Sequence, residues 1–138
     1  MRVLGLELGS KRIGVAVSDR SGTIATPLLV LQRTGNVGED HRRIAALVAE
    51  EEAERVVVGL PLSLDGSMGP AAKGAVAEAD ALATVVPVPV ETYDERLTTV
   101  TAESALREAR MRAEARRRVV DKVAAAVMLQ AWLDGQPR

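Results

Sequence analysis

The stretch VLGLELGSKRIGVAVSD, residues 3–19, predicts two strands joined by a tight glycine turn. Residues 2–8 and 12–18 are rich in Val, Leu and Ile, and the letters GSKR between them are typical of a hairpin. One acidic side chain, Glu7, falls at the end of the first strand. The stretch therefore predicts a sheet that opens with a hairpin and places a carboxylate at a strand end.

Apolar runs and helical periodicity extend this start along the chain. The predicted further strands are GTIATPLLVLQR at 22–33, the buried parallel strand ERVVVGLP at 54–61, and VPVPVETYDE at 86–95. The two prolines of the last strand favour a short strand or an edge position. The predicted helices cover residues 38–53, 70–83, 98–110 and 115–133. This order predicts an α/β fold, with a mixed sheet (a three-strand meander, then β-α-β-α-β) covered by helices.

Composition limits the class of protein. A chain of 138 residues fits one domain, 1–138, and its core must be aliphatic because it has no Phe, one Trp and one Tyr. The absence of Cys excludes disulfides, zinc fingers and cysteine nucleophiles. No apolar run approaches the ~20 residues that span a bilayer, and the N-terminus does not resemble a signal peptide. We expect a cytoplasmic protein without a membrane anchor.

Charge is unevenly distributed. The chain has a net charge of −1, yet the segment REARMRAEARRR at 107–118 holds six Arg and two Glu, a local balance of +4. Such a segment is either a phosphate-binding face or a solvated helix face with Arg–Glu pairs.

Three carboxylates fall where chemistry is expected. Glu7 ends the first strand, Glu95 follows the fifth, and Asp121 lies near the start of the last helix. Sites in such folds form at the carboxyl ends of strands. Oxygen ligands suit Mg²⁺ or Mn²⁺, and His41 is the only histidine, so no His cluster competes. Two such ions can activate water and stabilise the leaving oxygen of a phosphodiester.

Simpler interpretations stay open. Asp121 is spaced to pair with Arg117 or Arg118 on its own helix. The glycine turn could cradle a phosphate with its backbone N–H groups and Lys11, although the spacing is not that of a P-loop. Gly59 would let its strand come close to another group.

The motifs GLELGSKRIGVAVSD, VVVGLPLSLDGSMGP, YDERLTTVTAE and VVDKVAAAVMLQAWLD occur in an order that resembles the YqgF/RuvX family. These are Holliday junction resolvase-like proteins described as pre-16S rRNA nucleases. The resemblance spans residues 3–134. It implies a ribonuclease H-like fold and Mg²⁺- or Mn²⁺-dependent cleavage of structured nucleic acid, either precursor rRNA in ribosome biogenesis or branched DNA.

The resemblance also implies which residues act. Carried over by motif, Glu7, Glu95 and Asp121 are the catalytic and metal-binding acids. Lys11 and Arg12 after the glycine turn are expected to contact substrate phosphate. The remaining predicted nucleic-acid contacts, in the "DER" motif and the basic segment, are Arg96, Arg110, Arg116, Arg117 and Arg118.

One residue departs from the family pattern, which has aspartate where this chain has Glu7. The added methylene moves the carboxylate by on the order of 1–1.5 Å. The site then relaxes to fit, prefers Mn²⁺, or binds nucleic acid without cutting it, which makes an attenuated nucleic-acid-binding protein the alternative function. An actin-like ATPase, with a related core, is opposed by length because it needs two such domains. Junction resolution favours a homodimer, whereas RNA trimming needs only a monomer.

Overall fold

A computed structural model of the chain describes residues 1–97 and 113–137, with side chains described for 1–96 and 121–137. The strands are β1 (Val3–Leu8), β2 (Arg12–Ser18), β3 (Ala25–Gln32), β4 (Arg55–Leu60) and β5 (Val90–Asp94). The helices are α1 (Val37–Glu50), α2 (Pro70–Ala83), the short 3-10 helix η1 (Glu95–Leu97) and α4 (Ala113–Asp134).

The strands form one mixed sheet in the order β3-β2-β1-β4-β5. Antiparallel pairing of β1 with β2 and of β2 with β3 makes the predicted meander, while β4 is parallel to both β1 and β5. The prolines before β5 fit its edge position, as predicted. The helix predicted over 70–83 has the bounds expected, whereas the helix predicted over 98–110 lies outside the described residues.

Two of the helices begin at residues that favour a helix start. The Asn36 side chain accepts a hydrogen bond from the backbone N–H of Glu39 at 2.9 Å and caps α1. Helix α2 begins with Pro70, a residue whose fixed φ and missing N–H suit the first helical position.

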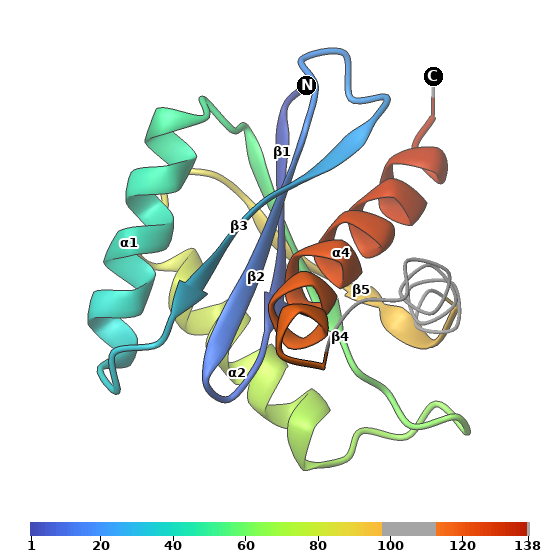
Figure 1. Cartoon of the computed structure of the whole chain (residues 1–138). Helices are drawn as coiled ribbons and strands as arrows, with labels where there is room; N and C mark the ends of the chain where they lie inside the picture. Colours follow the sequence, from blue (N-terminus) through green and yellow to red (C-terminus); the bar gives the residue numbers. More distant parts are fainter. Residues whose placement is uncertain (98–112, 138) are drawn as a thin grey trace.

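Helices cover both faces of the sheet, with α1 and α2 on one face and α4 on the other (Figure 1). Strand residues alternate between the two faces. Leu4 and Leu6 therefore pack with Ile44 and Leu82 under α1 and α2, whereas Val3 and Val57 pack against α4. The face of β1 that carries Val3 also carries Glu7, so this carboxylate points to the α4 side.

The helix predicted over 115–133 was expected to supply apolar surface through Val119, Val120, Val123, Val127, Leu129 and Trp132. Leu129 and Trp132 are buried as expected, and the side chains of Val119 and Val120 lie outside those described. Val123 and Val127 are only partly buried, whereas Ala125, Met128 and Leu129, none of them branched at Cβ, are fully buried. A Cβ added at Gly5 would lie 3.0 Å from the Leu129 Cβ, which shows how closely α4 approaches β1. Alanine suits this contact because it lets the helix backbone come near the sheet.

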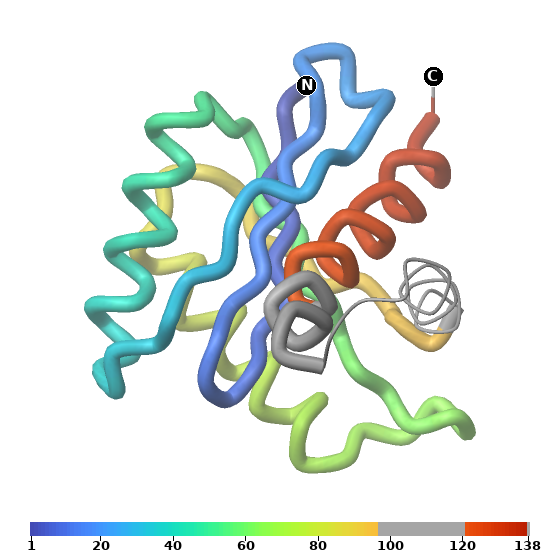
Figure 2. Tube along the Cα trace, in the orientation of Figure 1, coloured from blue at the N-terminus to red at the C-terminus, as the bar shows by residue number. Residues whose placement is uncertain are grey.

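The β1–β2 turn and the beginning of α4 lie at the same end of the sheet, and the N-terminus lies at the opposite end (Figure 1). The loop after β4 extends from the end that holds the β1–β2 turn (Figure 2). Among the described residues, no helix has both the length and the apolar character needed to cross a bilayer.

Candidate active site

Glu7 and Glu95 meet above Gly59. Leu6 pairs with Val58 across the parallel β1–β4 ladder, so Glu7 and Gly59 are the next residues of the two strands. A Cβ built on Gly59 would lie 2.5 Å from Glu95 Oε1 and 2.8 Å from Glu7 Oε2. Any side chain at this position would therefore displace both carboxyls, and the close approach expected at Gly59 is confirmed.

The electrostatics of Glu7 follow from this meeting. Burial raises the pKa of Glu7 to about 10, and a hydrogen bond shared with Glu95 and the charges of Glu95 and Asp121 act in the same direction. The Glu7 Oε2 atom is buried, and no hydrogen-bond partner for it is found among the described residues. Without a neutralising cation, the Glu7 carboxyl keeps its proton at neutral pH, because burial first, and Glu95 and Asp121 next, disfavour its charged form.

A second glycine brings Asp121 to the same place. Glu7 pairs with Gly14 of β2, and a Cβ on Gly14 would lie 2.0 Å from the Asp121 backbone oxygen. Glycine is thus required for α4 to pack against the sheet here. Glu7 lies between two glycines, one making room for the helix of Asp121 and the other for the side chain of Glu95.

Asp121 is held by a residue of the neighbouring strand. Arg12 Nε donates to Asp121 Oδ2 at 2.8 Å, and both side chains are largely shielded from solvent. Arg12 was predicted to contact phosphate, and its position next to the acids allows both roles. The pairing of Asp121 with Arg117 or Arg118 concerns side chains outside those described.

The acids offer an incomplete but chemically suitable set of metal ligands. Glu7, Glu95 and Asp121 supply only oxygen atoms, and the unpartnered Oε2 of Glu7 is a buried acceptor that a cation would satisfy. Within the described part of the chain, however, no three acidic or histidine side chains are arranged tightly enough to hold an ion. Asp121 is turned to Arg12 instead, so a three-carboxylate site would require this ion pair to open.

The other predicted contact residues lie around this end. Lys11 is exposed in the β1–β2 turn. Arg96 forms a 2.6 Å ion pair with Asp94, and the hydrogen bonds from Arg96 hold the pKa of the Asp94 carboxyl below its ordinary value. Arg96 also lies against Gly66, where a Cβ would be 3.0 Å from its Nη1. Arg110 lies outside the described residues, as do the side chains of residues 116–118.

The family of the chain is shown by sequence comparison. The model of the RuvX family, described as "Holliday junction resolvase", matches residues 1–135. The chain belongs to the RuvX family. It is therefore a member of a nuclease family, and the predicted resemblance is confirmed.

Relatives in this family cover nearly the whole chain. A protein of Mycobacterium sp. (strain KMS) is 50% identical over 134 residues, which is 96% of this chain and 79% of the relative. A protein of Mycobacterium ulcerans (strain Agy99) is 51% identical over the same share of this chain and 78% of its own. Both relatives are named "Putative pre-16S rRNA nuclease".

Solved structures agree on the fold. The RuvC of T. thermophilus in complex with a Holliday junction substrate has a TM-score of 0.61 at 19% identity, covering 98% of this chain and 97% of RuvC. The yeast mitochondrial Holliday junction resolvase Ydc2 has a TM-score of 0.58 at 10% identity, covering 95% of this chain and 77% of its own. The ribonuclease H-like fold predicted for this RuvX-family chain is confirmed.

Two features of the site, the close approach at Gly14 and the pairing of Arg12 with Asp121, were not predicted from the sequence. Gly14 lies in the middle of a strand otherwise rich in β-branched residues. A glycine at such a position weakens the strand and often marks a close approach by another group, so the sequence held a signal for this contact. No sequence signal joins Arg12 to Asp121, since the two are 109 residues apart.

Proposed function

We propose that this RuvX-family chain is a metal-dependent nuclease that cleaves phosphodiester bonds in structured nucleic acid. The observation that carries the proposal is the meeting of Glu7 and Glu95 above Gly59, with Asp121 close enough to raise the pKa of Glu7. Family membership supports the reaction class. The whole chain, residues 1–138, is proposed to form one nuclease domain.

In this proposal Glu7, Glu95 and Asp121 hold Mg²⁺ or Mn²⁺. Bound divalent ions supply an activated water and stabilise the leaving oxygen. The protein contributes a largely buried pair of carboxyls whose mutual repulsion favours cation binding. Asp121 would hold an ion together with Glu7 and Glu95, and Arg12, no longer paired with it, would then be available to a substrate phosphate on the same side of the sheet.

Precursor 16S rRNA, in the cytoplasm, is the proposed substrate, because the two Mycobacterium relatives described above carry the name "Putative pre-16S rRNA nuclease". Branched DNA is the other substrate class suggested, by the family description. Lys11, Arg12 and Arg96 are proposed to bind phosphates. With one Trp, one Tyr and no Phe, the chain offers few aromatic rings for stacking, which favours recognition of backbone and shape.

Cleavage assays test this function. The full chain is incubated with a precursor 16S rRNA fragment and, separately, with a synthetic four-way junction, each with Mg²⁺, Mn²⁺ or EDTA. We expect metal-dependent cleavage of the RNA that Asp121→Asn abolishes and that Asp134→Asn leaves intact. Asp134 is a matched control because it lies near the other end of the same helix. Cleavage that survives in EDTA, or in Asp121→Asn at the full rate, would remove the proposed site.

A binding protein that does not cut is the second candidate. Two observations favour it: the Arg12–Asp121 ion pair, and the lack, in the described residues, of three acids placed to hold an ion. It predicts salt-dependent RNA binding with no turnover in either metal. Measured binding at several salt concentrations, beside the cleavage assay, separates the two candidates.

A further inference from the structure

The turn between β1 and β2 connects two residues of the proposed site, Glu7 and Arg12. The turn is closed by its own hydrogen bond, from the Gly9 N–H to the Arg12 carbonyl at 2.8 Å. Arg33, which follows β3, adds two more. Its backbone N–H donates to the Lys11 carbonyl at 2.9 Å, and its side-chain Nε donates to the Gly9 carbonyl at 2.7 Å. Arg33 therefore holds the turn through the carbonyl groups of both Gly9 and Lys11.

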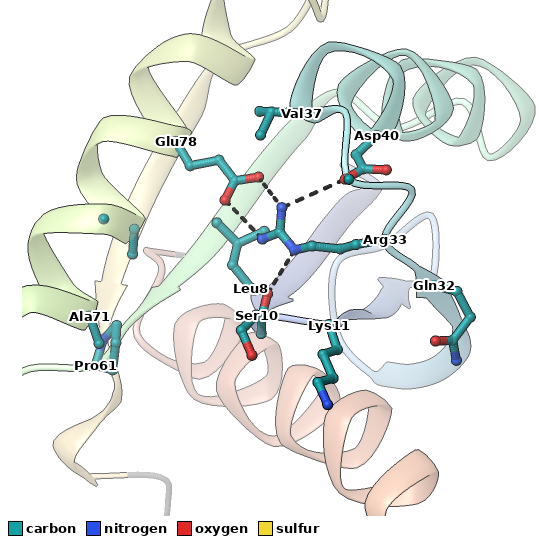
Figure 3. A pocket seen from close by; sticks show the side chains of 14 residues that line it. Leu8, Ser10, Lys11, Gln32, Arg33, Val37, Asp40, Pro61, Ala71 and Glu78 are labelled. Carbon is teal, nitrogen blue, oxygen red and sulfur yellow. Dashed lines mark hydrogen bonds and ion pairs between the residues drawn. The ribbon is translucent and has the colours of Figure 1, made fainter.

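The guanidinium of Arg33 is itself held in place. Its Nη1 and Nη2 donate to the two carboxylate oxygens of Glu78 on α2 at 2.9 and 2.8 Å, and Asp40 of α1 lies 3.8 Å away (Figure 3). His41 on α1 bonds the same Glu78 carboxylate at 2.9 Å. Arg33, Asp40 and Glu78 border a cavity of about 740 Å³. Such a planar, bidentate pair fixes the orientation of the guanidinium.

The charges of this cluster persist at neutral pH. Burial acts to raise the pKa of the Glu78 carboxyl, but hydrogen bonds from Arg33 and His41 outweigh it and hold the pKa below its ordinary value. Burial acts likewise on Asp40, and hydrogen bonds from Thr34 and the charge of Arg33 reverse the effect on its pKa. Arg33 thus keeps two ionised partners and is poorly exposed to water.

We propose that Arg33 is a positioning residue for the nuclease site: it fixes the Gly9–Lys11 turn, and Glu78 fixes Arg33. By fixing the turn, Arg33 and Glu78 hold Glu7 and Arg12, which flank it, in place. Arg33 contacts only the backbone of Lys11, and the Lys11 side chain points away from the Arg33–Glu78 pair (Figure 3). Within the described residues no hydrogen bond or ion pair involves the Lys11 ammonium, which leaves it available for phosphate. This inference rests on the proposed function, since the site it positions is the proposed one.

The test compares Arg33→Lys with Arg43→Lys. Lysine keeps the charge but cannot donate to Gly9 and Glu78 at once. Arg43 is a matched control because its Nη1 donates at 2.7 Å to the Gln32 carbonyl, next to Arg33, without reaching the turn. Amide hydrogen exchange of residues 9–12 is measured first, in the full chain without metal or nucleic acid. We expect roughly tenfold faster exchange in Arg33→Lys and wild-type exchange in Arg43→Lys.

Cleavage of the precursor 16S rRNA fragment is measured next, well below the melting temperature of every variant. We expect kcat to fall roughly 10- to 100-fold in Arg33→Lys, with a smaller change in KM, because a small displacement of a reacting group is costly. Glu78→Gln, a milder change, is expected to act in the same direction. The effects of Arg33→Lys and Glu78→Gln should be less than additive, since the two residues act as one unit.

Two results would overturn the positioning role. One is unchanged exchange at residues 9–12 in both Arg33→Lys and Glu78→Gln. The other is a fall in melting temperature with kcat equal to that of Arg43→Lys, which is what a purely structural role predicts. If the wild-type chain cuts no substrate, the nuclease function fails, and the exchange measurement still decides whether Arg33 holds the turn.

Discussion

Arg12 Nε and Asp121 Oδ2 lie 2.8 Å apart and join strand β2 to helix α4 beside the pair of carboxyls. The guanidinium neutralises one of the three acids that the proposed metal site needs. In the proposed function, cation binding and the ion pair therefore compete for the Asp121 carboxylate. This competition can be measured without any nucleic acid.

Replacing Arg12 by Gln should change metal affinity and intrinsic stability in opposite directions. Loss of the charged hydrogen bond is expected to lower the free energy of unfolding of the metal-free protein by about 1–2 kcal/mol. With Asp121 released, Mn²⁺ should stabilise Arg12→Gln at a lower concentration than it stabilises the wild type. Melting temperature against Mn²⁺ concentration measures both effects.

Arg20→Gln is the control for this experiment. Arg20 pairs with Glu52 at 3.4 Å in a well-exposed ion pair away from Glu7, Glu95 and Asp121. Such exposed pairs contribute little to the free energy of unfolding. Its Mn²⁺ dependence should match the wild type. If Arg12→Gln needs as much Mn²⁺ as the wild type, Arg12 does not compete with the ion.

The pH dependence of stability should report the buried Glu7 carboxyl. The pKa of Glu7 is raised from 4.5 to about 10 by burial first and by Glu95 and Asp121 next. Between these values the unfolded chain has lost this proton while the folded chain keeps it, so the free energy of unfolding falls as pH rises. Glu7→Gln removes this loss. In EDTA at pH 8 we expect it to melt several degrees above the wild type, a gain on the order of 1–3 kcal/mol.

Glu50→Gln controls for the loss of one negative charge, because Glu50 is exposed at the end of α1. The difference between wild type and Glu7→Gln should shrink toward pH 5 and grow toward pH 9, whereas Glu50→Gln should follow the wild type throughout. A Glu7→Gln variant that melts with the wild-type pH slope would mean that Glu7 ionises normally.

Much of the fold was predictable because its signals are local. Hairpin chemistry between residues 8 and 12, the apolar run before Gly59 and Pro70 at a helix start each act within a few residues. The edge position of β5 followed from its prolines, which cannot supply N–H groups to a neighbouring strand. The buried face of α4 was only partly predictable. Leu129 and Trp132 were expected there, but the close helix–sheet contact also buries the small Ala125 and leaves Val123 and Val127 only partly buried.

The site was predicted as three acids sharing one metal site, without the contacts that place them. Glu7, Glu95 and Asp121 were selected by their places at strand ends and in motifs, and the structure brings Glu7 and Glu95 together. The pairing of Asp121 with Arg12 and the contacts of Arg33 with the β1–β2 turn and with Glu78 were not predicted. Both join residues that are far apart in the sequence, as Arg33 and Glu78 are. Such pairs depend on how the helices cover the sheet, which no short stretch encodes.

Gly59→Ala should remove activity while sparing the fold. The added Cβ would meet the ends of two side chains, Glu95 Oε1 at 2.5 Å and Glu7 Oε2 at 2.8 Å, and side-chain ends can move aside. The displaced carboxyls would no longer be placed for chemistry, so we expect cleavage of the precursor 16S rRNA fragment to fall about 100-fold. The melting temperature should change by only a few degrees.

Gly14→Ala and Gly74→Ala serve as comparisons for Gly59→Ala, because one is expected to destabilise the fold and the other to leave both fold and activity intact. A Cβ at Gly14 meets the backbone of Asp121 at 2.0 Å and must push α4 off the sheet, which is expected to cost about 3 kcal/mol or more of stability. A Cβ at Gly74 of α2 meets nothing within 4 Å, so Ala there should stabilise by about 0.5–1 kcal/mol and leave cleavage intact. Full activity in Gly59→Ala would show that the position of the two carboxyls does not matter.

Glu7→Asp decides between an adapted nuclease and an attenuated one. The shorter side chain withdraws the carboxyl by on the order of 1–1.5 Å toward β1 and away from Glu95. If the site has adapted to glutamate, Glu7→Asp should cut the precursor 16S rRNA fragment about 10- to 100-fold more slowly, and this is the result we expect. Cleavage is measured with Mg²⁺ and with Mn²⁺, with binding measured in parallel to show that the substrate still docks. Faster cleavage by Glu7→Asp would instead mean that glutamate weakens the natural site, and the chain would then act mainly by binding nucleic acid.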